Sequence, residues 1–300
     1  MKTTLWARLS FMMFLEFFIW GGWYVTLGTF VKYNLNGNGF DSANIFSTQS
    51  YGAIIAPFII GLIADRFFNA EKILGVLHLI GAFLMYKMYT SESVGVFYPY
   101  VFGYFIAYMP TIALANSISF RQMTDPEKQF SSIRMLGSLS WIVTGVLISY
   151  VFHWDSDAAA KGGMLKYTFL MSSIASLALG LYSFTLPKTP PVKGKEKAGS
   201  IAEILGLDAL KMLANKNFLI FFISSILICI PLSFYYQNAH TFLEDIKMSN
   251  PAAMMGIGQV SEVLCILLIP FFFSRFGFKK TIVLGMLAWV LRYLLFAYGN

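Results

Sequence analysis

One stretch of the sequence decides the fold: Pro251-Ala-Ala-Met-Met-Gly-Ile-Gly-Gln259-Val-Ser-Glu262-Val-Leu-Cys-Ile-Leu-Leu-Ile-Pro270-Phe-Phe-Phe-Ser-Arg275-Phe-Gly-Phe-Lys-Lys280. Its apolar run has the length of about 20 residues that an α-helix needs to cross a bilayer. The stretch therefore predicts a membrane-spanning helix with one ionisable residue, Glu262, inside the membrane. The basic residues at its end predict that the helix leaves the membrane on the cytoplasmic side.

The composition of the whole chain is typical of a polytopic membrane protein. Hydrophobic residues make up 57% of its 300 residues and charged residues only 12%, against about 25% charged in soluble domains. Its lysines and arginines stand between apolar runs, which indicates membrane topology and argues against nucleic-acid binding. Both cysteines, Cys229 and Cys265, fall inside apolar runs, where a small buried hydrophobic role is usual. The cysteine spacing indicates neither a metal site nor a disulfide framework, and no cofactor is expected.

The length of about 20 residues that one membrane-spanning helix needs predicts nine such helices in this chain, in two groups. A polar stretch that starts at Pro187 separates the groups and has the composition of a linker. After Ser200, apolar residues at helical spacing predict a short amphipathic helix on the membrane face. The predicted spans are residues 9–30, 44–65, 72–90, 95–120, 130–153 and 163–186, and then 217–243, 252–275 and 280–298.

The distribution of basic residues predicts the orientation of these spans. With the N-terminus inside, most lysines and arginines of the loops and of the linker fall on the cytoplasmic side. Such an excess of basic residues is typical of cytoplasmic loops. We therefore expect a cytoplasmic N-terminus.

Two similar turns indicate an internal repeat. Gly61-Leu-Ile-Ala-Asp65-Arg66 joins the second and third spans, and Ser274-Arg275-Phe276-Gly277 joins the second and third spans after the linker. This arrangement resembles the major facilitator superfamily, which implies two parallel halves of six helices that rock about a central site. Gly61, Asp65 and Arg66 are then expected in a gating loop. The alternative is that both are ordinary short turns with basic residues, because short motifs match loosely.

The resemblance predicts three regions in the chain. Residues 1–186 are expected to be a six-helix N-terminal half, and 187–216 a cytoplasmic linker with an amphipathic helix. Residues 217–300 are expected to be the first three helices of a C-terminal half. On this reading the chain holds about nine of twelve expected helices, and three more would follow Asn300.

Five segments narrow the resemblance to the bacterial nucleoside:proton symporters of this superfamily. They are Phe14-Leu-Glu16-Phe-Phe-Ile-Trp20-Gly-Gly-Trp23, Ala107-Tyr-Met-Pro-Thr111, Ile133-Arg134-Met-Leu-Gly137-Ser138, Gln259-Val-Ser-Glu262 and Ala288-Trp-Val-Leu-Arg292-Tyr-Leu-Leu-Phe-Ala-Tyr-Gly299. The resemblance implies import of nucleosides with protons by alternating access in the inner membrane. It implies that the substrate contacts Arg134, Ser138, Trp141, Gln259 and Glu262. Where well-studied members have amides on the seventh span, this chain has Ser233 and Tyr236, so Tyr236 is also a candidate and the substrate range stays open.

The residues support such a site by their own chemistry. Arg134, Ser138 and Trp141 are spaced i, i+4 and i+7, so they share one helical face. A nucleoside offers a flat base and sugar hydroxyls, which aromatic, amide and charged side chains can bind. Two alternatives stay open: Trp141 packs against core or lipid, or Arg134 extends to the cytoplasmic headgroups.

Two carboxyl groups are candidates for proton coupling, because an ionisable residue inside a membrane by default marks an ion path or a proton relay. Glu262 lies among apolar residues, which disfavour the charged form of a carboxyl group. Its alternative role is a permanent ion pair with Arg292 on the next span. Glu16 is the second candidate, and its alternative is a structural ion pair with Arg134. The histidines are not clustered, and each is expected to be satisfied or interfacial: His78, His153 and His240.

The sequence leaves two alternatives to a nucleoside transporter. An enzyme is not expected, because no nucleophile, base or metal constellation has a recognisable spacing. A facilitator-type carrier for another polar solute, such as a sugar, is the main rival. The expected partners are a nucleoside, protons and the lipid bilayer, without nucleic acid, and the protein is expected to be a monomer.

Overall fold

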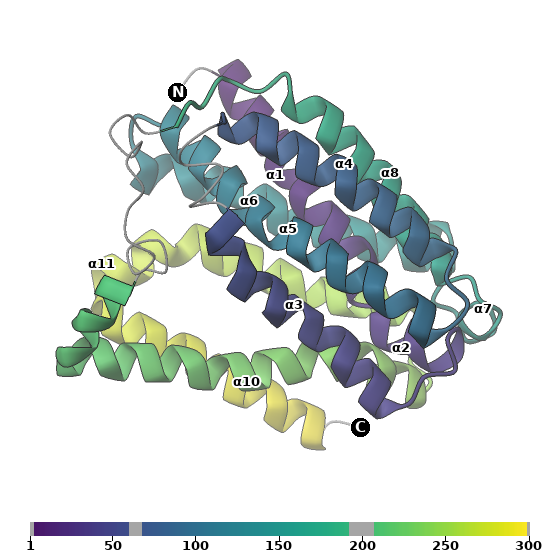
Figure 1. Cartoon of the computed structure of the whole chain (residues 1–300). Helices are drawn as coiled ribbons and strands as arrows, with labels where there is room; N and C mark the ends of the chain where they lie inside the picture. Colours follow the sequence, from purple (N-terminus) through teal and green to yellow (C-terminus); the bar gives the residue numbers. More distant parts are fainter. Residues whose placement is uncertain (1–2, 60–67, 192–206, 299–300) are drawn as a thin grey trace.

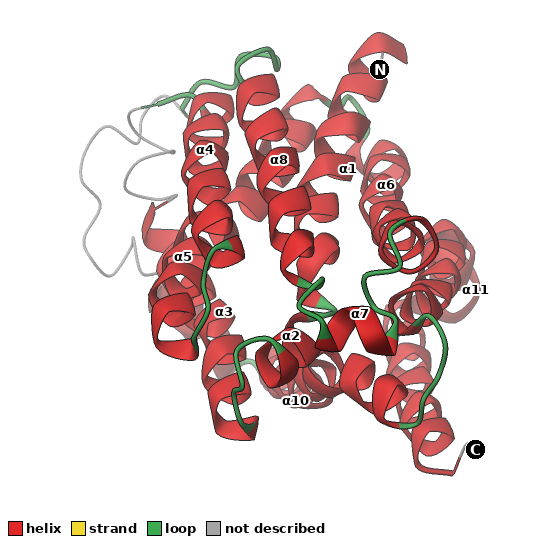
Figure 2. Ribbon diagram, turned by 90° about the vertical axis from the view of Figure 1, so that its right-hand side faces the viewer, coloured by secondary structure: helices red, strands yellow, loops and turns green. Residues whose placement is uncertain are grey.

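The structure is a computed structural model that describes residues 3–59, 68–191 and 207–298. The described secondary structure is helical throughout and is joined by short turns (Figure 2). This confirms the predicted all-α class. The predicted gating residues Gly61, Asp65 and Arg66 lie outside the described residues.

Six long helices make up the first part of the chain, as the sequence predicts (Figure 1). The first span breaks at Val25 and Thr26 and continues as a shorter helix, and the fifth span ends in a π-helix, Leu147–Val151. The helices are α1 (Thr3–Tyr24), α2 (Leu27–Tyr33), α3 (Gly39–Ile59), α4 (Ala70–Tyr89), α5 (Val94–Gln122), α6 (Pro126–Val146), the short α7 (Asp157–Lys161) and α8 (Lys166–Ser183).

The second part contains α10 (Lys216–Asp245) and α11 (Pro251–Tyr298). Gly277 interrupts α11 with a φ of 73°, so α11 comprises two of the predicted spans joined at the predicted turn. A positive φ is far easier for glycine than for other residues. Before α10, Leu207–Ala214 forms a 3-10 helix, where we expected an α-helix; short 3-10 turns are common in connectors.

Seven helical segments in the described ranges are long and apolar enough to cross a membrane. They include the first span as α1 and α2 together, and the two parts of α11 separately. The predicted spans 44–65 and 163–186 correspond to α3 and α8, which pack in the same bundle without meeting that criterion. The multi-pass architecture is therefore confirmed.

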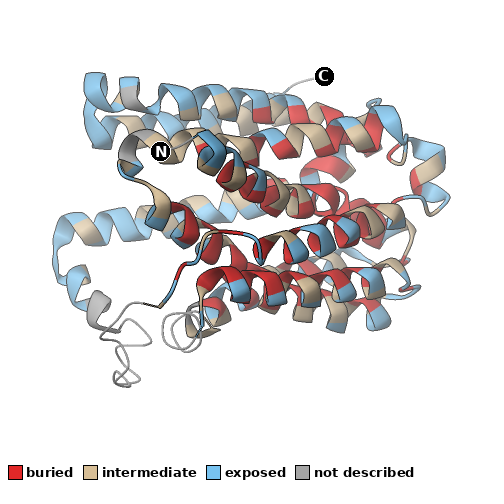
Figure 3. Cartoon of the chain, turned by 90° about the horizontal axis from the view of Figure 1, so that it is seen from above, coloured by how far each residue is buried: buried red, intermediate tan, exposed pale blue. Residues whose placement is uncertain are grey.

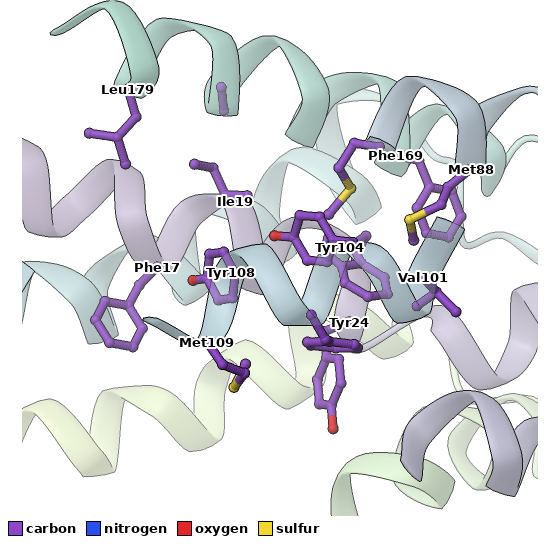
Figure 4. Close-up of a cluster of buried hydrophobic side chains, with 14 of the residues drawn as sticks. Phe17, Ile19, Tyr24, Met88, Val101, Tyr104, Tyr108, Met109, Phe169 and Leu179 are labelled. Carbon is purple, nitrogen blue, oxygen red and sulfur yellow. The ribbon is translucent and has the colours of Figure 1, made fainter. Parts of the chain in front are cut away.

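An aromatic cluster holds the first part of the chain together. Trp23 of α1 is fully buried, and its ring lies 5.5 Å from the rings of Tyr104 and Phe169 and 5.6 Å from that of Phe105. Tyr104 and Phe169 approach α1 from different helices in Figure 4. Rings at these separations pack with favourable edge and tilted geometries. This cluster fixes α1 against α5 and α8.

The burial of α10 and α11 shows where the second part meets the first. The buried residues of α10 all lie between Tyr235 and Glu244, and those of α11 lie between Pro251 and Gln259. Both groups contact the first part of the chain near α2, which lies beside α7, so we call this end of the molecule the α7 end (Figure 1). Figure 3 colours the same chain by burial. At the opposite end, near the linker, these helices are exposed or half-buried. The two parts are therefore packed together at the α7 end.

Candidate functional site

A cavity of about 710 Å³ lies between α10 and α11 on one side and α1, α3 and α6 on the other. This volume is within the range of about 300–1,000 Å³ that is common for small-molecule sites. The structure brings together around this cavity all six residues that the sequence singled out for substrate binding: Arg134, Ser138, Trp141, Tyr236, Gln259 and Glu262.

Helix α6 presents one face to the cavity, as the i, i+4, i+7 spacing predicts. Ser138 lies on this face, and its hydroxyl donates a hydrogen bond to Glu262 Oε1 of α11 at 3.0 Å. This bond joins the two parts of the chain inside the cavity. Glu262 is otherwise exposed to the cavity, so its second carboxylate oxygen is accessible.

Arg134 lies one turn before Ser138 on the same face of α6. Its guanidinium carbon is 4.0 Å from the centre of the Phe17 ring, which is a cation–π distance. Its Nη1 is buried and finds no hydrogen-bond partner among the described residues. The guanidinium group borders the cavity, and one of its donors has no partner among the described residues.

Glu16 lies away from the cavity in a buried polar network. Its Oε2 is 2.8 Å from His78 Nε2 of α4, and its Oε1 accepts a hydrogen bond from Thr111 of α5 at 2.6 Å. Tyr108 donates to the backbone carbonyl of Glu16, also at 2.6 Å. The pairing of Glu16 with Arg134 that the sequence left open is therefore wrong, because both oxygens of this carboxyl group already have partners on α4 and α5.

The sequence analysis did not identify His78 as the partner of Glu16. His78 lies 62 positions from Glu16 in the sequence and is 1% exposed. Its Nδ1 is 3.3 Å from Ser176 Oγ of α8, and Ser176 donates to the His78 carbonyl. The available signal was that Glu16 and His78 are each an isolated polar residue in an apolar span. That signal does not indicate which two residues meet.

Arg292 shares the cavity with Glu262 but does not form the predicted alternative ion pair with it. The guanidinium carbon lies 4.6 Å from the Trp289 ring centre and 4.9 Å from that of Tyr235. In the described parts of the chain, no ion pair within 4.0 Å joins Glu262 to Arg292 or to Arg134. The carboxyl group of Glu262 is left free to interact with a bound molecule.

Four aromatic rings form a wall across the two parts of the chain. Trp141 lies 5.8 Å from Trp20 and 5.7 Å from Tyr236, and Tyr24 lies 5.6 Å from Trp20 and 5.9 Å from Tyr236. Tyr24 also donates a hydrogen bond to Gln49 of α3, which lines the cavity. The sequence analysis did not select Trp20, Tyr24 or Gln49. Trp20 appeared there only within one of the five segments that carry the family resemblance.

Cys229 and Cys265 are exposed and line the cavity, so the expectation that both are buried is wrong. An apolar helix face is expected to pack against other helices, but at these two positions it borders the cavity. No group of three histidine, cysteine or acidic side chains suited to a metal ion occurs in the described ranges.

Comparison with known proteins gives one consistent family. The family model described as "Nucleoside H+ symporter" matches residues 1–300. Putative nucleoside transporter YegT of Escherichia coli is 41% identical over 303 residues, covering 100% of this chain and 69% of that protein. Xanthosine permease of Escherichia coli is 33% identical, covering 98% of this chain and 71% of that protein.

Solved structures agree with the sequence matches. A crystal structure of nucleoside transporter NupG superposes with a TM-score of 0.80 at 30% identity, covering 99% of this chain and 75% of that one. The xylose transporter XylE of E. coli has a TM-score of 0.60 at 16% identity, covering 91% of this chain and 74% of that one. The second likeness concerns the fold alone.

Proposed function

Because the chain belongs to the nucleoside H+ symporter family, we propose that the cavity between its two parts is the place where a nucleoside and a proton are bound during import. The chain is a multi-pass membrane transporter of the major facilitator fold, and its family imports nucleosides in symport with protons. The single observation that carries the site proposal is the bond from Ser138 to Glu262. It places a carboxyl group beside a predicted substrate residue and between the two moving parts.

The aromatic wall is proposed to bind the nucleobase. A base has a flat π-face that stacks on aromatic side chains, and stacking contributes about 1–3 kcal/mol per base. Trp141 and Tyr236 come from opposite parts of the chain and lie 5.7 Å apart. A base seated on this wall therefore contacts both parts at once, as a substrate of a rocking transporter must.

The polar side of the cavity is proposed to bind the sugar. Arg134 offers an unpaired donor, and Ser138, Gln259 and Glu262 offer further donors and acceptors. Ribose hydroxyls both donate and accept hydrogen bonds, so this set is complementary to them. Gln259 is buried on the same face of α11 as Glu262, one turn earlier.

Glu262 is proposed to carry the proton. Its side chain faces the cavity, so it meets whichever solution the cavity opens to, and such an intramembrane carboxyl group is a typical proton-relay residue. When Glu262 is protonated, the negative charge is removed from the inter-part contact with Ser138. Glu16 is the less suitable candidate, because it is fully buried and its carboxyl oxygens already have partners.

The orientation and domain division are proposed as the charge pattern predicts. The linker end faces the cytoplasm, residues 1–186 act as one moving unit, and the helices after residue 216 belong to the second unit. Because the two parts are packed at the α7 end, the structure then corresponds to an inward-facing state. Nucleoside and protons are the proposed partners, and a monomer suffices for the site.

Uptake by full-length protein in liposomes tests the function. An inward pH gradient is expected to drive accumulation of a labelled nucleoside, and excess unlabelled nucleoside, but not excess sugar, is expected to compete. Competition by sugars alone would support the rival carrier for another polar solute. Proposed nucleoside transport would then be wrong.

A further inference from the structure

A carboxylate of the first part of the chain caps a helix of the second part. Asp155 follows the π-helix Leu147–Val151, and its Oδ2 accepts a hydrogen bond from the backbone N–H of Ala252 at 3.0 Å. Ala252 lies in the first turn of α11, where backbone N–H groups have no partner within the helix. Anionic side chains are favoured at this position by the helix dipole. The cap is unusual in that it comes from the opposite side of an interface that must separate during transport.

Ser149 strengthens this contact. Its hydroxyl donates to Asp155 Oδ2 at 2.6 Å and accepts from the N–H of Ala253 at 2.9 Å. Ser149 is fully buried and Asp155 is 2% exposed. Ser149 lies inside the π-helix, and His153 between the two residues has a φ of 53°. This irregular backbone brings the hydroxyl and the carboxylate together at the start of α11, and π-helical turns often occur at functional sites.

Two further polar contacts join the same surfaces. Thr29 Oγ1 of α2 lies 2.8 Å from Nδ1 of His240 on α10, and both residues are 1% exposed or less. Lys32 forms an ion pair with Asp245 at 2.7 Å, but both side chains are exposed. An exposed ion pair contributes little to stability. The buried contacts are therefore the main polar connection at the α7 end.

An apolar layer separates these contacts from the cavity. Val25 and Ile148 of the first part pack with Ala252 and Met255 of α11, and all four are buried. Trp141 and Tyr236 of the aromatic wall border the same layer. The polar contacts therefore lie beyond the closed wall of the cavity, on the route to the outside in the proposed orientation.

We propose that Asp155, with Ser149, is the outer latch of the transporter: it holds the cavity closed to the outside by capping α11, and it releases α11 when the outer end opens. This inference rests on the proposed transport cycle and orientation. The polar contacts at the closed α7 end are not all satisfied, because Asp155 Oδ1 of the latch and Nε2 of the neighbouring His240 find no partner among the described residues. Opening would give both atoms water. Buried polar atoms without partners oppose the closed state, so the latch remains reversible.

Thiol labelling from the outside tests the latch. Cys229 and Cys265 are the two cysteines of the 300-residue sequence, and both line the cavity, so they serve as reporters. Intact cells are treated with a membrane-impermeant maleimide, and the labelling rate is measured without nucleoside. Asp155→Ala is expected to raise the rate about three- to tenfold, because it removes a charge-assisted cap. Ser149→Ala is expected to raise it less. Cys229→Ser with Cys265→Ser gives the blank.

Asp157→Asn is the matched control, because Asp157 is an exposed acidic residue two positions away that pairs with Lys161 within α7. It is expected to label at the wild-type rate. Labelling of Asp155→Ala at the wild-type rate overturns the latch. If Asp155→Ala does not reach the membrane, Asp155→Asn and Ser149→Ala are labelled instead. Wild-type labelling rates in both variants overturn the latch proposal. Since no nucleoside is used, a protein that fails to transport nucleosides still gives a clear result here.

Discussion

Single side chains in the cavity differ in whether their hydrogen-bonding capacity is filled. Among the described residues, Arg134 keeps a buried donor without a partner, and Glu262 has a hydrogen-bond contact only with the hydroxyl of Ser138. Glu16 has partners for both carboxyl oxygens. A group with unfilled capacity is ready to bind a ligand, whereas a filled group holds helices together. This contrast separates the proposed site residues from the structural ones.

Arg134→Lys is expected to weaken nucleoside binding almost as much as Arg134→Ala, by about tenfold or more, because lysine lacks the planar fork of donors. A binding titration with purified full-length protein measures this. Arg121→Lys is the control, since Arg121 donates to the Pro190 carbonyl outside the cavity. If the lysine variant binds like the wild type, Arg134 contributes only a positive charge.

Glu262→Gln is expected to abolish proton-driven accumulation while exchange of nucleoside across the membrane partly survives. The glutamine keeps an oxygen that can accept from Ser138 but cannot exchange a proton. Accumulation and counterflow are measured in liposomes, with the exposed Glu92→Gln as control. Accumulation with its normal pH dependence in Glu262→Gln contradicts the proton-carrier role.

His78→Ala is expected to destabilise the protein by about 3–5 kcal/mol, because it leaves the Glu16 carboxyl group buried without its partner. Thermal unfolding of the purified protein reports this as a lower Tm. Glu92→Gln, at an exposed position, is expected to leave the Tm unchanged. A normal Tm with a shifted pH profile of uptake would instead assign the pair to proton coupling.

At the scale of helices, the closed end depends on two close approaches. A Cβ atom on Gly145 of α6 would lie 2.8 Å from the carbonyl oxygen of Ala252. One on Gly28 of α2 would lie 2.9 Å from the carbonyl oxygen of Gln237. Small residues permit such contacts between membrane helices.

Gly145→Ala is therefore expected to oppose closure of the α7 end by about 1–3 kcal/mol, the usual effect of overpacking. Labelling of the cavity cysteines from outside is expected to increase and nucleoside uptake to decrease. Gly95→Ala is the control, because a Cβ there meets no atom within 4 Å. Unchanged labelling in Gly145→Ala would show that α6 and α11 accommodate the added methyl group while the α7 end stays closed.

Helices and the cavity face of α6 could be predicted from the sequence, because apolar length and helical spacing are local properties. The contacts between Glu16 and His78 and between Asp155 and α11 could not. Each joins residues far apart in the chain, and polar residues in apolar spans have several geometrically suitable partners. The cysteines were placed wrongly for a related reason: hydrophobicity shows that a helix face avoids water but not whether it meets another helix or a cavity.

At the scale of the whole molecule, the two parts are joined at one end and separate at the other, as alternating access requires. An N-terminal reporter tests the proposed orientation. A tag before Thr3 is expected to be protected from added protease in intact cells and cleaved in inside-out vesicles. Cleavage in intact cells would place the linker end outside and reverse the assignment of the latch.

The Glu16 network also bears on how the protein is synthesised. Its members come from α1, α4, α5 and α8, all of which precede the linker. Domains generally fold as units in the order in which the ribosome produces them. The first unit can therefore satisfy its buried carboxyl group before α10 is made. The later helices are then added to a first unit that is already folded. No polar group of this network stays unpaired in lipid while its partner is still to be synthesised.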